Sequence, residues 1–109
     1  MAEARYMRNA YWMGAPVSGK DEQFRKAIDT EVAPAFRQLP GILAMRVLWP
    51  EKADDGAPPI ACEFLLEFAD RADVEVMRTS PERAAMGPRL QEIMKMFEGS
   101  IRHIEFAVA

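Results

Sequence analysis

His103 is the single histidine of this 109-residue chain, and it lies in the segment IRHIEFAV (101–108). Alternate residues of a strand point to the same face, so a strand here places His103 beside Glu105. A carboxylate from Glu105 or Glu63 could orient the imidazole as a general base. The alternative is a structural histidine, hydrogen-bonded at an interface, because no nucleophile is paired with it. We predict that this less apolar face of the strand points away from the helices.

Four more charged residues are expected on the same face as His103: Arg8, Arg46, Glu63 and Glu67. Charges that become buried must be paired, so we interpret this group as a salt-bridge network at an interface between subunits. Cys62 alternates with apolar residues in the segment around it, and we expect its thiol to be buried and inert.

The opposite face of the sheet is predicted to form an apolar cleft beneath the helices. Its one phenol, that of Tyr11, is the only other catalytic candidate beside His103. Such a lining is first of all typical of a hydrophobic core. The same lining also describes a pocket for a small, flat, apolar ligand that carries one or two oxygens. The expected cleft residues are Tyr11, Phe24, Val32, Phe36, Met45, Phe64, Leu66, Leu90, Met94 and Phe106.

The residue types give no support for a metal or cofactor site. One histidine and one cysteine do not make a cluster of metal ligands. The segment MGAPVSGKDE (13–22) contains two glycines and a lysine, but it has neither the P-loop spacing nor the dinucleotide-binding spacing. We therefore predict no metal and no cofactor.

Composition narrows the class of protein further. The net charge is −3, and no basic stripe is present, which argues against binding to nucleic acid or to an anionic membrane. A single cysteine cannot form an internal disulfide, which favours a reducing cytoplasm. No apolar run approaches about 18 residues and the start lacks a signal-peptide core, so we expect neither membrane insertion nor export. The length fits one domain, residues 1–109.

The order of elements follows from hydrophobic spacing and from the turn residues between segments. An apolar stripe from Phe24 to Leu39 predicts a first helix that carries Pro34 and ends at Gly41. A second helical region begins near Ala72 and restarts after TSPE (79–82), and Gly99 is predicted to end it. Strands are predicted over residues 6–13, 42–49, 60–69 and 101–108.

This order, β-α-β-β-α-β, predicts an α+β, ferredoxin-like fold. Right-handed crossovers place both helical regions on one face of a four-stranded antiparallel sheet. The segment ILAMRVLW (42–49) is apolar on both faces, so the face without helices also needs a cover. We predict a homodimer in which two such sheets pack face to face, as a dimeric α+β barrel.

The segment EQFRKAIDTEVAPAFRQLPGI (22–42) resembles the first helix of the EthD-like branch of the dimeric α+β barrel superfamily. The shared features are the Glu-x-Phe-Arg start, the Ala33–Pro34 pair and the Leu-Pro-Gly end, and EFLLEFADRADVEVMRTSPE (63–82) resembles the family's third strand and second helix. The resemblance implies a tolerated kink at Pro34 and a strand-one tyrosine at Tyr11. It departs at Val32, where family members commonly carry a histidine, so chemistry assigned to that histidine does not transfer.

Two classes of function stay open. The resemblance and the aromatic cleft favour a cofactor-independent lyase, isomerase or oxygenase that acts on an aromatic or polyketide-like compound of a catabolic or biosynthetic pathway. Val32 favours the alternative, a non-catalytic protein that binds such a compound for a partner enzyme. A haem site, known elsewhere in the superfamily, would have only His103 to rest on.

Overall fold

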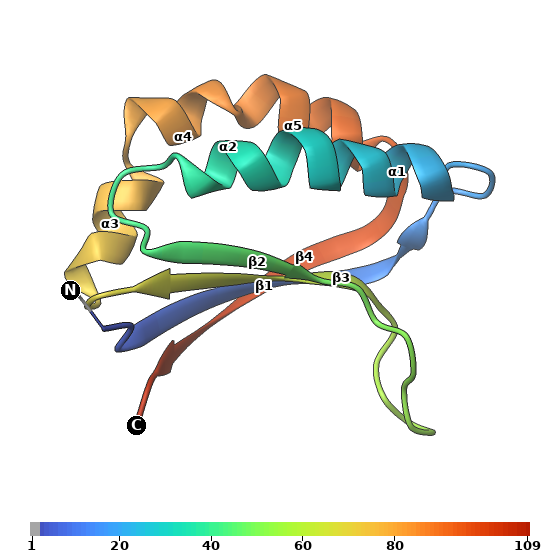
Figure 1. Ribbon diagram of the computed structural model, residues 1–109. Coiled ribbons are helices and arrows are strands. Elements are labelled where there is room, and N and C mark those ends of the chain that lie inside the picture. Colours follow the sequence, from blue (N-terminus) through green and yellow to red (C-terminus); the bar gives the residue numbers. More distant parts are fainter. Residues whose placement is uncertain (1–2) are drawn as a thin grey trace.

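The computed structural model of the chain describes residues 3–109. Within these residues four antiparallel strands form one sheet in the order β2-β3-β1-β4, and all the helices lie on one of its faces (Figure 1). This is the predicted ferredoxin-like arrangement. Among residues 3–109, none of the helices combines the length and the apolar character that crossing a membrane requires. The elements are β1 (Tyr6–Pro16), α1 (Asp21–Ala27), the π-helical turn η1 (Ile28–Val32), α2 (Ala33–Arg37), β2 (Ala44–Leu48), β3 (Ile60–Phe68), α3 (Ala72–Arg78), α4 (Pro81–Ala85), α5 (Gly87–Met94) and β4 (Phe97–Ala107).

The first helix accommodates its proline through a change of helical pitch. The π turn of η1 ends at Val32, and Pro34 then occupies the first turn of α2. Proline has no N–H to donate, and a single π turn widens a helix locally and lets it bend at that point. Gly41 ends the turn that follows α2, and its φ is +85°. A Cβ at this position would lie 2.7 Å from the Asp73 carbonyl oxygen. Glycine at position 41 is therefore required both by backbone conformation and by the close approach of α3.

An aromatic cluster forms the centre of the core between the helices and the sheet. Trp12 of β1 is 1% exposed, and its ring lies 5.5 Å from Phe24, 5.4 Å from Phe64 and 5.4 Å from Phe97. Burying a large apolar side chain contributes about 1.5–3 kcal/mol, so this cluster is a main source of stability. Cys62 is fully buried beside it, and burial raises the pKa of its thiol to about 12. The prediction of a buried cysteine is confirmed.

The second helical region starts as predicted but ends earlier. Ser80 is the N-cap of α4, and its hydroxyl accepts a hydrogen bond of 3.1 Å from the Arg83 amide. The prediction that Gly99 ends the helix is wrong, because α5 ends at Met94 and Gly99 lies inside β4, opposite Gly14 of β1. Both glycines have positive φ, +131° at Gly14 and +147° at Gly99. A Cβ on either would collide with the partner strand's backbone, so the two strands approach each other there through paired glycines.

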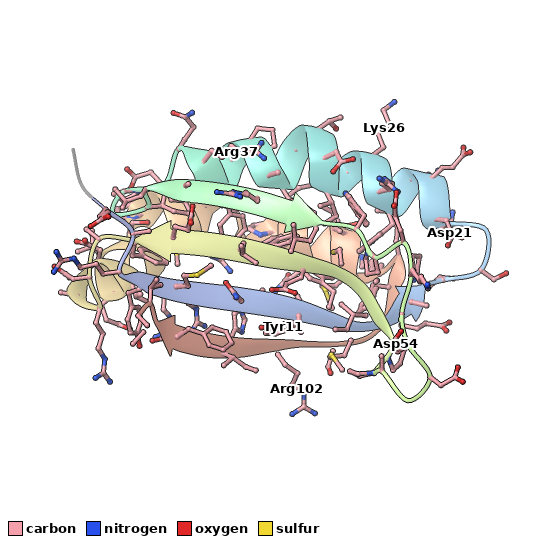
Figure 2. The ribbon with its side chains drawn as sticks, turned by 60° about the horizontal axis from the view of Figure 1, so that its bottom comes forward. Tyr11, Asp21, Lys26, Arg37, Asp54 and Arg102 are labelled. Atoms are coloured by element: carbon pink, nitrogen blue, oxygen red, sulfur yellow. The ribbon has the colours of Figure 1, made fainter. Side chains whose placement is uncertain are left out.

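The register of the strands shows which residues share a face. Tyr11 pairs with Glu63 on β3 and with Arg102 on β4, and cross-strand partners point to the same side. This side is the face without helices, which we call the open face, and Figure 2 brings it forward with Tyr11 and Arg102 labelled. The same parity of β4 places Phe106 there, 39% exposed. The prediction that Tyr11 and Phe106 line the cleft under the helices is therefore wrong.

The opposite parity of β4 faces the helices. His103 pairs with Ala10, and Glu105 pairs with Arg8, so all four lie on the helix side of the sheet. The prediction that His103, Glu105 and Arg8 point away from the helices is wrong. The physical reason is that β4 carries apolar residues on both of its faces. The more apolar set of alternate residues, which includes Ile104, lies on the open face.

Part of the predicted charged group does share the open face. Arg46 and Glu67 form an ion pair there with an N···O distance of 3.7 Å. Glu63 lies on the same face, and burial raises the pKa of its carboxyl. The open face also exposes Leu48 of β2 and Ile104 of β4, which are 43% and 49% exposed. It is thus an apolar surface with a few charges.

Candidate functional site

A cavity of about 380 Å³ lies between the sheet and the short helices α2, α3 and α4. Strands β1, β3 and β4 form its floor, and the three helices form its walls. Ala10 of β1 pairs with Phe64 on β3 and with His103 on β4. Because its side chain is a single methyl group, it leaves space above the sheet between these two larger side chains. The lining residues are Arg8, Ala10, Phe36, Phe64, Leu66, Met77, Arg78, Arg83, Ala84 and His103. We call this cavity the pocket.

The pocket combines an apolar floor with a basic rim. Phe64 and Leu66 of β3 are almost fully buried, and Phe36 covers them from α2 with its ring 5.8 Å from that of Phe64. The rim carries three guanidinium groups, one from β1, one from α3 and one from α4. Apolar walls with a few convergent polar groups are typical of small-molecule sites.

Two of the three guanidiniums are already neutralised by carboxylates. Arg8 Nη1 donates to Glu105 Oε2 at 2.7 Å, and the Tyr6 hydroxyl donates to Glu105 Oε1 at 2.8 Å. These bonds lower the pKa of the Glu105 carboxyl, the Tyr6 hydroxyl contributing most. Arg78 pairs with Glu75 of its own helix at 2.8 Å. Both arginines therefore already have a carboxylate partner within the chain, a partly buried one for Arg8 and a solvent-exposed one for Arg78.

Arg83 differs from the other two arginines. No carboxylate oxygen of residues 3–109 lies within 4.0 Å of its guanidinium. Its Cζ instead lies 5.6 Å from the centre of the Phe36 ring, within reach of a cation–π contact. Burial, together with the charges of Arg8 and Arg78, lowers the pKa of this guanidinium, which still stays charged at neutral pH.

His103 lies at the mouth of the pocket, with part of its surface open to solvent. Its pKa is lowered, first by loss of contact with water and then by the charges of Arg8, Arg78 and Arg83, while Glu105 acts in the opposite sense. An imidazole with a pKa below its usual range is neutral at pH 7. A neutral His103 can therefore accept a proton from a molecule in the pocket.

The predicted cleft residues divide into several groups. Phe36, Phe64 and Leu66 line the pocket. Val32 and Leu90 line a separate small cavity of about 60 Å³ between the η1–α2 segment and α5. The others lie in or against the core, or on the open face: Phe24 and Met45 in the core, Met94 packed against it, Tyr11 and Phe106 on the open face. The expected single cleft is thus two cavities and a packed core.

Sequence reasoning missed most of the basic rim. Arg8 could have been found from its parity with Trp12, because a tryptophan in a strand is the residue most in need of burial and fixes the face of its neighbours at i−2 and i−4. Arg78 and Arg83 carried no such signal. Their direction depends on how the chain turns at TSPE, which brings two short helices over one end of the sheet.

Within the described part of the chain, no group of three or more His, Cys, Asp or Glu side chains is arranged to hold a metal ion. The groups that line the pocket are one imidazole, three guanidiniums and an apolar floor.

No protein-family model matches the sequence, and no curated protein matches it. Solved structures do. An EthD family protein from Bacillus halodurans has 15% identity over 96% of this chain and 99% of its own, with a TM-score of 0.75. A monooxygenase of Streptomyces coelicolor in complex with nanaomycin D has 9% identity over 97% and 88%, with a TM-score of 0.64. A dimeric ferredoxin-like protein of unknown function from Thermobifida fusca has 13% identity over 99% and 95%, with a TM-score of 0.63.

At these identities the likeness shows the fold. The chain has the ferredoxin-like α+β fold that it shares with the EthD family protein and the other two structures, as the resemblance in its sequence implied.

Proposed function

We propose that this protein binds a small aromatic or polyketide-like compound in the pocket and acts on it as a cofactor-independent enzyme. The observation that carries the proposal is the position of His103, a neutral imidazole at the mouth of a cavity with an aromatic floor and a basic rim. Among solved structures of the same fold, the monooxygenase in complex with nanaomycin D supports this class of compound.

The chemistry that fits these groups is proton abstraction. A neutral His103 takes a proton from a carbon next to a carbonyl group, and the electron pair of that C–H bond moves to the carbonyl oxygen as an enolate. Guanidinium groups at the rim, Arg83 first among them, stabilise the negative charge as it develops. Enolate formation is the first step shared by isomerisation, by carbon–carbon cleavage and by reaction with oxygen, so it fits each of the three reaction types.

The second candidate is a non-catalytic binding or accessory protein of the same fold. Val32 supports it, because this residue is 3% exposed and places a hydrocarbon where the family resemblance led us to expect an imidazole. In this case the pocket holds the compound without changing it, and His103 serves only as a polar contact at its mouth.

Self-association completes the proposal. Leu48, Ile104 and Phe106 together form an apolar open face that a second copy would cover, and the Thermobifida fusca structure of the same fold is described as dimeric. The buried Asn9 also lies on this face, and its Oδ1 lacks a hydrogen-bond partner within residues 3–109. We therefore propose a homodimer through the open faces. A cytoplasmic location remains part of the proposal, supported by the single cysteine.

Hydrogen exchange of a model ketone tests the enzymatic proposal. The probe is 2-tetralone, a flat bicyclic ketone whose C1 protons exchange with D₂O and disappear from the proton NMR spectrum. The protein should accelerate this exchange over buffer, the His103→Gln variant should return it to the buffer rate, and Arg102→Gln on the opposite face of the same strand should leave it unchanged.

The other outcomes separate the two candidates. Binding of 2-tetralone with no acceleration of exchange rejects the enzyme and favours the accessory protein. Absence of binding at millimolar concentration rejects the pocket as a site for such compounds, and both candidates fall with it.

A further inference from the structure

The pocket carries more positive charge than its own carboxylates neutralise. Glu105 forms an ion pair with Arg8, and Glu75 forms one with Arg78. The charge of Arg83 therefore has no counter-ion within residues 3–109. The whole chain has a formal net charge of −3, so the excess of positive charge in the pocket is opposite in sign to the charge of the chain. A guanidinium that is half-buried and unpaired is costly unless something pairs with it.

The surroundings of Arg83 indicate what that partner would be. Its guanidinium contacts the face of Phe36 and lines the same cavity as the buried side chains of Phe64 and Leu66. A ligand that fills the cavity would place an apolar body on this floor and a polar end at the rim. A planar guanidinium binds an oxyanion with two parallel hydrogen bonds, which no neutral group matches as well.

We propose that the compound bound in the pocket is an anion: a flat apolar body with an ionised oxygen function, such as a carboxylate or an enolate, paired with Arg83. This inference rests on the proposed function, because it names the charge of the ligand for the same pocket. Arg8 and Arg78, each held by its own carboxylate, frame the site, and Arg83 is the group left to bind the ligand.

A matched pair of probes tests the charge alone. 2-Naphthoate and 2-naphthamide have the same bicyclic skeleton, and only the naphthoate is charged. Isothermal titration of the full chain should show that 2-naphthoate binds about tenfold or more tightly than 2-naphthamide, which is the size of effect expected for one charge-assisted hydrogen-bonded pair.

Variants then assign the effect to Arg83. Arg83→Gln should bring the affinity for 2-naphthoate close to that for 2-naphthamide, with little change in the latter. Arg83→Lys should retain part of the preference, since it keeps the charge and loses the planar fork. Arg102→Gln removes the same charge from the middle of β4 on the open face and should change neither affinity.

Equal binding of the two probes to the unmodified protein would overturn the inference and leave the aromatic pocket standing. A preference for 2-naphthoate that survives in Arg83→Gln would also overturn it. Failure of both probes to bind at millimolar concentration would remove the proposed function, and the inference with it. The comparison of the two probes on the unmodified protein holds even if a variant does not fold.

Discussion

Alanine at Gly99 should be one of the most destabilising single-methyl changes in this chain. The φ of +147° at this position is one that L residues adopt at a cost of about 1–3 kcal/mol. The added Cβ would also collide with the Met13 carbonyl oxygen on β1, which is backbone and has no rotamer to escape through. Relief requires β1 and β4 to separate locally, and each cross-strand hydrogen bond lost costs about 1 kcal/mol.

With two such bonds weakened, the expected loss in the free energy of unfolding is about 3–5 kcal/mol, against a typical total of about 5–15 kcal/mol. Urea unfolding followed by circular dichroism measures it. Gly56→Ala is the matched control, since Gly56 also has a positive φ, +88°, but nothing lies within 4 Å of the added Cβ. That variant should lose only about 1–2 kcal/mol.

The comparison decides between two positions for Gly99. A glycine that merely ends a helix, as the sequence pattern indicated, would cost no more than the control when replaced. If Gly99→Ala and Gly56→Ala lose the same stability, the pairing of Gly99 with Gly14 is refuted, and with it the register that places His103 over the pocket.

Three further predictions concern the open face, the small cavity beside Val32 and the stability of the fold at acidic pH. Leu48→Glu should dissociate the proposed dimer in sedimentation experiments by placing an unpaired charge at its seam, whereas Val76→Glu on α3 should not; an unchanged dimer would contradict the interface. Val32→His should lose about 1–3 kcal/mol in urea unfolding, because an imidazole enters an apolar wall, and should leave binding of 2-tetralone intact; a histidine that titrates at its usual pKa at no cost would show that residue 32 is exposed. The hydrogen bond from Tyr6 lowers the pKa of Glu105, so this carboxylate stabilises the fold above its ordinary value of 4.5, and the stabilisation is lost as the pH falls through the lower, folded value. Glu105→Gln should therefore be less stable than the unmodified protein at pH 7 and approach it on acidification, as thermal unfolding across this range would show; a constant difference would contradict the ion pair.

The sequence was sufficient to predict the order of elements and the fold. The stripe from Phe24 to Leu39 and the Ser80–Pro81 start of α4 are strong local signals, and the structure confirms both. They work because helix spacing and capping depend on neighbouring residues alone. The end of α5 and the start of β4 were harder to predict, since Gly99 pairs with Gly14, a residue far away in the sequence.

The candidate site was predicted only in part, because a strand that is apolar on both faces does not reveal which face meets the helices. In β4 the parity with Ile104 and Phe106 is the more apolar, yet it covers the open face. A shift of one residue in a strand moves every side chain to the other face of the sheet. For this reason His103 was expected on the open face and Tyr11 on the helix side, whereas the structure has them the other way round. The burial of Phe36 and Phe64 could be predicted, since helix spacing and strand alternation both place these residues in the core.

Ligands are proposed to bind in the pocket beside His103 and not on the open face. The most direct test is a titration of the protein with 2-tetralone, followed by NMR of ¹³C-labelled methionine methyl groups and of the single histidine ring. Met77 lines the pocket, and Met7 lies on the open face opposite Phe106. We expect the Met77 and His103 signals to shift together, with one dissociation constant, while the Met7 signal stays unchanged. A shift of Met7 with Met77 and His103 unmoved, or no shift of any signal, would contradict it.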